Sequence, residues 1–223
     1  MIPACDYDQI CRELGNAFRH RYPAGEAGST RMIGLLFAPR EARLAKDEII
    51  PGLDYFHHRS GNHIDFFCAG YSRYGFTPGE RPVTQDDPPW MFSAEAFDRF
   101  RRDIERRSRW RYSGEADLLL MNGTRGVDEG AASLDFSSTI VCDLDRMIQD
   151  HAIHSARRFF EDVFRFAEGV ETLDPTWGFS DEMGARTASS ALKRVILSLL
   201  PKDLGTDYRR AEHFAIRDVS RAS

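Results

Sequence analysis

Hydrophobic residues in this sequence gather into short apolar runs separated by polar stretches that are compatible with helices. The run at residues 32–38 is apolar almost throughout, and a second apolar run follows at 64–69. Strands that are covered on both faces, as in parallel sheets, have this composition. The polar segment between them, residues 40–59, fits the helical crossover that two parallel strands require. The pattern therefore predicts a strand–helix–strand unit over residues 31–72.

Periodicity on either side of this unit predicts the remaining elements. Apolar residues recur every fourth position within residues 5–21, which is typical of a helix. Pro51 interrupts the crossover, so we expect two helical pieces that meet at this residue. The Asn122–Gly123 dipeptide is typical of a turn at the end of a strand. The other expected elements are helices at 94–110, 155–168, 181–200 and 208–219, and an antiparallel pair of strands at 116–121 and 137–144.

Residues 70–91 are rich in glycine, proline and aromatic residues. The stretch is too long and too irregular for a simple connection between a strand and a helix. Long loops of this kind either cover a core or form a binding surface. Both interpretations stay open here, with Tyr71, Tyr74 and Trp90 as the candidate binding residues.

Composition narrows the class of protein. The chain has 223 residues, of which 42% are hydrophobic, so we expect a single domain over residues 1–223 with a substantial core. A net charge of -5 gives no general attraction to nucleic acid. No apolar stretch reaches the roughly 20 residues that a membrane-spanning helix needs, and residues 1–21 lack the pattern of a signal peptide. We therefore expect a cytoplasmic protein without membrane association.

The cysteines give no sign of a disulfide framework or a zinc site. Cys68 and Cys142 lie in apolar, strand-like runs, which is typical of buried thiols. Cys5 and Cys11 are six positions apart and would not share a helix face. The paired C-x-x-C spacing of structural zinc sites is absent from the sequence.

The expected elements follow the order strand, helix, strand, helix, strand, strand, helix. Residues 51–54 read Pro-Gly-Leu-Asp in the first helical segment, and residues 118–123 read Leu-Leu-Leu-Met-Asn-Gly in the third strand. In this order and in these local sequences the chain resembles thioredoxin-like domains. The resemblance implies an α/β fold with a βαβ-αββα core at about residues 31–168, in which helices flank a mixed central sheet. Residues 1–30 and 169–223 would then be helical additions.

The resemblance also implies a redox-inactive protein. The thiol pair of that family would follow the first strand, where residues 39–43 read Pro-Arg-Glu-Ala-Arg. Disulfide exchange needs one thiolate to attack and a second thiol to resolve the mixed disulfide. The family's cis-proline would stand near Ala116, where the sequence has no proline. Such domains act as binding or scaffold modules, so we expect an adaptor for protein–protein interaction that needs no cofactor.

Two surfaces are candidates for binding. The expected helix at 94–110 has one strongly basic side, and the candidate binding residues on this helix are Arg102, Arg106 and Arg107. This side is either ordinary solvated helix surface or a docking face for an acidic protein partner.

The second candidate is a pocket at the carboxyl ends of the strands, where open sheets bind ligands. In the thioredoxin-like arrangement, Arg40 and Arg43 would lie opposite Glu115 and Asp117. These four residues either bind a ligand or form structural ion pairs.

Metal-binding chemistry has weaker support. His57, His58 and His63 could hold a metal together with Asp65, but their spacing matches no standard zinc motif. Histidines near the carboxyl end of a helix are also explained by the helix dipole.

The other candidates for acid/base catalysis or metal binding can also be explained as ordinary surface residues. Asp143 and Asp145 at a strand end could hold Mg²⁺ or could be solvated. His151 and His154 could share a helix face, but they have no neighbouring nucleophile in the sequence. The phosphate-binding patterns of P-loop and Rossmann proteins are absent.

The first hypothesis for function is a non-catalytic module that binds another protein. Its rival is a small α/β enzyme or sensor for a nucleotide or similar polar metabolite, acting at the strand ends near Arg40, Glu115, Asp117 and Asp143. A third hypothesis is a metal-dependent hydrolase that uses His57, His58 and His63 as ligands.

Overall fold

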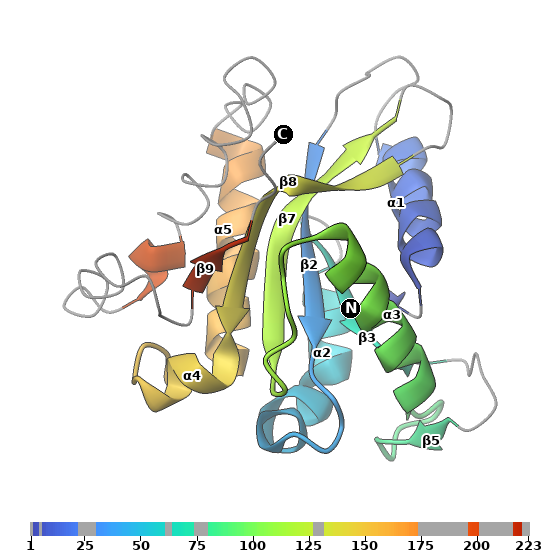
Figure 1. Cartoon of the computed structure of the whole chain (residues 1–223), viewed down its shortest axis with the longest axis vertical. Helices are drawn as coiled ribbons and strands as arrows, with labels where there is room; N and C mark the ends of the chain where they lie inside the picture. The colour runs from blue at the N-terminus through green and yellow to red at the C-terminus, as the bar shows by residue number, and fades with distance from the viewer. Residues whose placement is uncertain are drawn as a thin grey trace.

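A mixed sheet with helices on both faces forms the centre of the protein (Figure 1). The structure, a computed structural model, describes residues 2–4, 6–21, 30–60, 64–73, 80–126, 132–173, 196–200 and 216–219. Within this part of the chain the sheet has six strands. Their spatial order is β1 (Ile2–Ala4), β3 (Ile64–Ala69), β2 (Thr30–Phe37), β7 (Asp117–Arg125), β8 (Ala132–Asp143) and β9 (Ile216–Asp218).

The central strand β2 joins a parallel half of the sheet to an antiparallel half. β2 runs parallel to β3, which is in turn parallel to β1. On its other side β2 pairs antiparallel with β7, and β8 and β9 continue the antiparallel half. The predicted strand–helix–strand unit and the predicted mixed α/β sheet are confirmed.

Helices cover the two faces of the sheet in pairs (Figure 1). α1 (Tyr7–Arg21) and α3 (Ala94–Arg107) lie on one face. α2 (Leu53–Ser60) and α5 (Ala156–Leu173) lie on the other, and the short α4 (Leu144–Gln149) follows β8 at one end of the sheet.

Aromatic side chains fill the space between the sheet and the helices. On the α1/α3 face, the ring of Phe37 stacks 5.2 Å from that of Phe100 and lies 4.5 Å from that of Trp110. On the other face, Phe66 of β3 packs 5.2 Å from Phe160 and 5.4 Å from Phe164 of α5. Burying one such side chain stabilises a fold by about 1.5–3 kcal/mol, so both layers contribute to the core.

The type of helix changes along the crossover from β2 to β3, close to the expected place. The crossover consists of the π-helix η1 (Ala45–Ile49), the 3-10 helix η2 (Ile50–Gly52) and α2, and Pro51 lies in the first turn of η2. Because proline has no N–H to donate, regular α-helical hydrogen bonding cannot continue through it. The predicted irregularity at Pro51 is confirmed, but the prediction of two separate pieces is wrong, since the backbone stays helical from η1 to α2.

The described residues of the segment 70–91 pack over the hydrophobic core. The two-residue strands β4 (Tyr71–Ser72), β6 (Met91–Phe92) and β5 (Arg81–Pro82) make a second small sheet in the order β4-β6-β5. The side chains of Tyr71 and Trp90 are buried. Of the two interpretations of this stretch, the structure supports core cover for these aromatic residues; Tyr74 lies outside the described residues.

Several predicted boundaries were wrong. Asn122 and Gly123 lie inside β7 rather than in a turn, because the strand continues to Arg125 with partners on both sides. The helix expected at 208–219 is wrong in its described residues, because β9 pairs there with β8. Of the helix expected at 181–200, residues 196–199 are helical and residues 181–195 lie outside the described part. The N-terminal addition is not purely helical either, since β1 joins the sheet.

Candidate functional site

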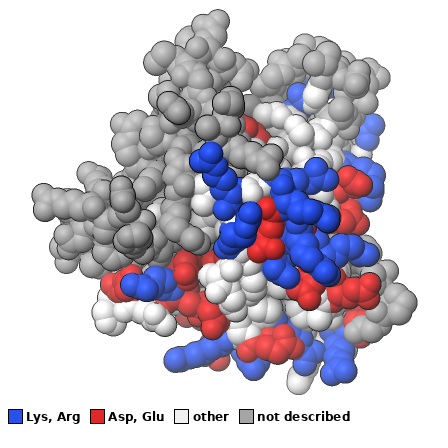
Figure 2. Space-filling view, viewed as in Figure 1, with Lys and Arg blue, Asp and Glu red and all other residues white. Residues whose placement is uncertain are grey.

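Arginine side chains concentrate along the outer side of α3. Residues 94–111 contain seven arginines and four acidic residues, in a chain whose net charge is -5. Ser93 caps the helix by accepting a hydrogen bond from the amide of Ala96, and the helix turns Phe97, Phe100 and Ile104 into the core. The arginines therefore point outward, and Figure 2 shows basic side chains gathered over α3 with acidic ones among them.

Three of these arginines follow one line along the helix. Arg99, Arg102 and Arg106 are all exposed and are spaced three and four residues apart, so they share one face. We call these three residues the arginine stripe. Arg102 donates to the carbonyl oxygen of Asp98 at 3.1 Å, and Arg106 forms an ion pair with Asp103. The Asp103 carboxylate offsets one of the three arginine charges, whereas the contact of Arg102 is with a neutral carbonyl, so the stripe keeps a net positive charge.

The neighbouring arginines serve the packing of α3. The guanidinium of Arg107 lies over the ring of Tyr7 in α1, 4.0 Å from its centroid. Arg101 pairs with Asp98 at 3.3 Å and with Glu105 at 2.9 Å. Of the predicted binding residues on this helix, Arg102 and Arg106 therefore lie on the open face, whereas Arg107 also bridges two helices.

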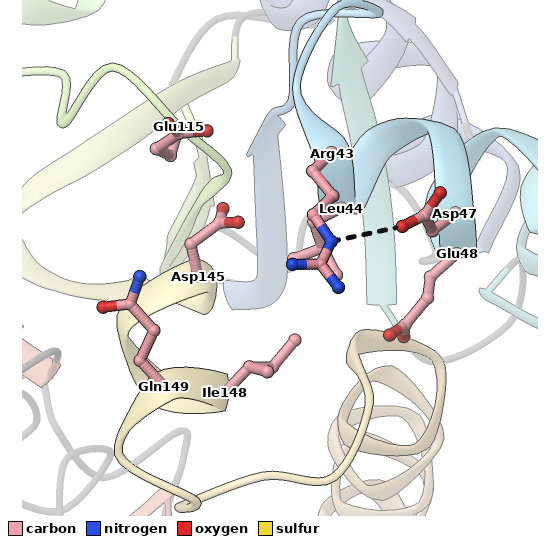
Figure 3. A pocket seen from close by; sticks show the side chains of 8 residues that line it. All are labelled: Arg43, Leu44, Asp47, Glu48, Glu115, Asp145, Ile148 and Gln149. Atoms are coloured by element: carbon pink, nitrogen blue, oxygen red, sulfur yellow. Dashed lines mark ion pairs between the residues drawn. The ribbon is translucent and has the colours of Figure 1, made fainter.

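A pocket of about 310 Å³ lies at the end of the sheet between η1 and α4 (Figure 3). Its walls come from three separate parts of the chain: the segment after β2, the end of the connection from α3 to β7, and α4. The lining residues are Arg43, Leu44, Asp47, Glu48, Glu115, Asp145, Ile148 and Gln149.

Carboxylates outnumber cations around this pocket. Its four acidic side chains face one arginine, Arg43, whose Nε lies 3.5 Å from Asp47 Oδ2. Asp145 Oδ2 accepts a hydrogen bond from the amide of Ala116 at 2.8 Å. Burial raises the pKa of Asp145, and the nearby Asp143 raises it further. The pocket therefore suits a positively charged or polar group better than a phosphate.

The arginines predicted to face Glu115 and Asp117 have other ion-pair partners. Arg40 pairs with Glu41 at 3.0 Å, and Arg43 pairs with Asp47. Glu115 does line the pocket with Arg43, but Asp117 is fully buried and is not among the lining residues.

Asp117 lies beneath the connection between α3 and β7. Its Oδ2 accepts hydrogen bonds from Trp110 Nε1 at 2.9 Å and from the amide of Ser113 at 3.0 Å. Burial raises the pKa of Asp117 to about 6, although the hydrogen bonds from Trp110 and from the amide and side chain of Ser113 lower it. This carboxylate therefore has a structural position rather than one open to a ligand.

The predicted aromatic binding residues belong to the interior. The Tyr71 hydroxyl donates to the carbonyl oxygen of Ala38 at 2.9 Å, and Trp90 Nε1 donates to Asp54 at 2.6 Å. Both side chains hold the 70–91 segment against the rest of the fold.

The predicted metal ligands do not form a site within the described residues. The rings of His57 and His58 lie 5.4 Å apart, and that of His57 lies 6.0 Å from Trp90. His63 lies outside the described part of the chain. Among the residues that the structure describes, no group of three or more His, Cys, Asp or Glu side chains could hold a metal.

Other acid/base candidates also occupy surface or capping positions. Asp143 caps α4 by accepting from the amide of Arg146 at 3.0 Å, so β8 ends there and Asp145 lies in the helix instead of continuing the strand. His151 and His154 are both exposed.

Thiol chemistry has little support from the three described cysteines. Cys68 and Cys142 are buried in β3 and β8, and burial raises the pKa of both thiols. Cys11 is partly buried in α1, and its pKa is also raised by burial. Thiols with raised pKa values are poor nucleophiles at neutral pH.

Sequence reasoning missed most of the pocket. Ile148 and Gln149 were not expected to be site residues, because α4 was not predicted. Asp47 and Glu48 lie in η1, which was expected only as part of the polar crossover. One signal was available: Asp143 directly before an apolar residue is a good helix N-cap.

No helix in the described ranges is long and apolar enough to cross a lipid bilayer. Comparison of the chain with protein-family models, with curated proteins and with solved structures found no match.

Proposed function

We propose that the chain is a thioredoxin-like domain without a redox thiol pair, which binds an acidic segment of a protein partner along the outer face of α3. The main observation in support of the binding role is the arginine stripe, Arg99, Arg102 and Arg106. It stands on a helix whose other side is anchored in the core.

The strand arrangement supports the fold part of the proposal. The order β3-β2-β7-β8, with β2 and β3 parallel and β7 and β8 antiparallel, agrees with the βαβ-αββα core that the sequence resembles. The position after β2 that would carry the redox pair holds residues 39–43, which include no cysteine. Shape and charge remain as the means of recognition.

Charge and rigidity support the choice of partner. A row of guanidinium groups spaced by turns of one helix matches carboxylates at similar spacing on an acidic helix or extended segment. Single exposed ion pairs contribute only about 0.2–1 kcal/mol, so several must act together. Attraction between opposite charges accelerates the association of the two proteins. The complex weakens as salt is added, because ions screen exposed charges.

Affinity purification from the native host, followed by binding measurements with the purified partner, tests the proposal. We expect Arg106→Glu to weaken binding roughly tenfold, which corresponds to about 1.4 kcal/mol. The matched control is Arg165→Glu on α5. Arg165 also pairs with an aspartate three residues earlier, and its side chain is 69% exposed against 74% for Arg106.

The control should bind like the wild type, and added salt should weaken the wild-type complex. If Arg106→Glu and Arg165→Glu bind equally well, α3 is not the interface. A partner segment without excess acidic residues would also contradict the proposal.

The pocket between η1 and α4 favours a second candidate function, recognition of a small polar metabolite as an enzyme or a sensor. Its carboxylates would repel nucleotide phosphates and attract an amine. A thermal-shift experiment should show stabilisation by spermidine rather than by ATP, with loss of the effect in Asp145→Asn and not in Glu41→Gln. Equal shifts in both variants would locate the ligand elsewhere.

A further inference from the structure

The Asp117 carboxylate is fully buried, although only one of its two oxygen atoms accepts a hydrogen bond within the described residues. Its side chain is 0% exposed. Oδ2 accepts hydrogen bonds from Trp110 Nε1 and the Ser113 amide, and the Ser113 side chain also favours the ionised carboxylate. Oδ1 is buried as well and has no hydrogen-bond partner in the part of the chain that the structure describes. A buried carboxylate with one unsatisfied oxygen destabilises its surroundings when it is ionised.

The hydrogen bonds to Asp117 from Trp110 and Ser113 come from the segment that joins α3 to β7, residues 108–116, which we call the connecting segment. Trp110 packs its ring on Phe37, 4.5 Å away. The Tyr112 amide donates to Glu105 Oε1 at 3.0 Å, and the Ala116 amide donates to Asp145. Acidic side chains thus hold the connecting segment at three points, and Asp117 is the buried one.

The charged neighbours of Asp117 do not compensate its charge. In the sheet, Asp143 of β8 is its cross-strand partner and carries the same sign. Two neutral groups also lie near Asp117: the thiol of Cys142, which precedes Asp143 in β8, and the hydroxyl of Tyr112 in the connecting segment. The charge of Asp117 raises the pKa of both groups. From α4, Asp145 reaches Ala116. From α3, Arg101 lies 5.9 Å from the ring centroid of Tyr112.

We propose that the connecting segment is a pH-sensitive element, which is held closed on the sheet while Asp117 is protonated and opens more often once Asp117 ionises. Opening exposes the carboxylate to water and relieves the penalty of its burial. The inference does not depend on the proposed partner.

The direction follows from proton linkage. In the closed state the pKa of Asp117 is raised from 3.8 to about 6, whereas in the open, hydrated state the group has its ordinary value. The closed state thus binds the proton more tightly. Its advantage is fully present below pH 4 and is lost as the pH rises through 6. The equilibrium constant for opening should rise roughly 25-fold between pH 4.5 and pH 7.5.

The consequence reaches both candidate sites. The connecting segment carries Arg109 and Arg111, which extend the basic surface of α3, and Glu115, which lines the pocket. Opening would move these charges relative to the fixed helix and pocket walls.

Amide hydrogen exchange as a function of pH tests the inference on the intact chain. The amide of Tyr112 reports opening well, because its acceptor is Glu105 of α3, which lies outside the connecting segment, rather than Asp117. After correction for intrinsic exchange, its protection should fall roughly 25-fold from pH 4.5 to pH 7.5. The amides of β2 should show no comparable change.

Two variants separate Asp117 from its neighbour. Asp117→Asn cannot ionise at this position and should remove most of the pH dependence, whereas Asp145→Asn, which removes the other carboxylate that contacts the connecting segment and has a raised pKa, should retain most of it. A flat profile in the wild type, or an unchanged dependence in Asp117→Asn, would overturn the inference. Should Asp117→Asn fail to fold, the carboxyl ¹³C titration of Asp117 in the wild type decides: a pKa near 6 supports the inference and one below 4.5 overturns it.

Discussion

Gly34 in the middle of β2 shows how closely the sheet packs on α5. A Cβ atom at this position would lie 2.6 Å from Cδ2 of Phe66 in the neighbouring strand. The Phe66 ring cannot easily move aside, because it packs against Phe160 and Phe164. The absence of a side chain at Gly34 therefore makes room for the aromatic layer.

At the residue scale we expect Gly34→Ala to destabilise the fold by about 1–3 kcal/mol, the usual cost of an extra methyl group in a packed core. Denaturant unfolding measures the free energy. Because the clash is with one ring, adding Phe66→Leu should recover part of the loss from Gly34→Ala, so the two changes are not additive. Additive effects of the two substitutions would show that the clash is elsewhere.

At the element scale, η1 and the start of α5 are joined through one carboxylate. Glu48 Oε2 accepts a hydrogen bond from the amide of Ala156 at 2.7 Å and a longer one from the amide of Arg157 at 3.4 Å. These amides belong to the first turn of α5, where N–H groups lack partners within the helix. A carboxylate there also interacts favourably with the helix dipole.

We therefore expect Glu48→Ala to lower the free energy of unfolding by about 1 kcal/mol, the typical cost of losing a helix cap. The control is Glu41→Ala, which removes an exposed glutamate that pairs with Arg40 at the surface. That change should stay within about 0.5 kcal/mol. Equal losses in the two variants would mean that the contact with α5 adds no stability.

Local sequence patterns predicted the elements that are buried on both faces or along one regular stripe. The runs of β2 and β3 are buried on both faces, and the Ser93 cap with its apolar stripe defines α3. The failures have physical reasons. Asn122 and Gly123 are part of β7 because they pair with β2 on one side and with β8 on the other. β9 is a strand because it pairs with the free edge of β8. Tertiary pairing decides both cases and leaves no local signal.

At the scale of the whole molecule, the two candidate sites differ in how far sequence could reveal them. The arginine stripe is local: one helix and its spacing suffice to place Arg102 and Arg106 on a common face. The pocket is not local, because its walls come from Arg43, Glu115 and Asp145, which meet only after the sheet has formed. The resemblance predicted that Arg43 would lie opposite Glu115, but no local pattern in the sequence predicted that Asp145 joins them.

The central position of β2 also affects how the chain is made. β2 pairs with β3 on one edge and with β7 on the other, and the ribosome must add the whole stretch 70–116 between those two partners. At ~5–20 residues per second this takes several seconds. During that time one long apolar edge of the nascent chain stays open, so chaperones that recognise extended hydrophobic segments have their best opportunity to bind before β7 emerges.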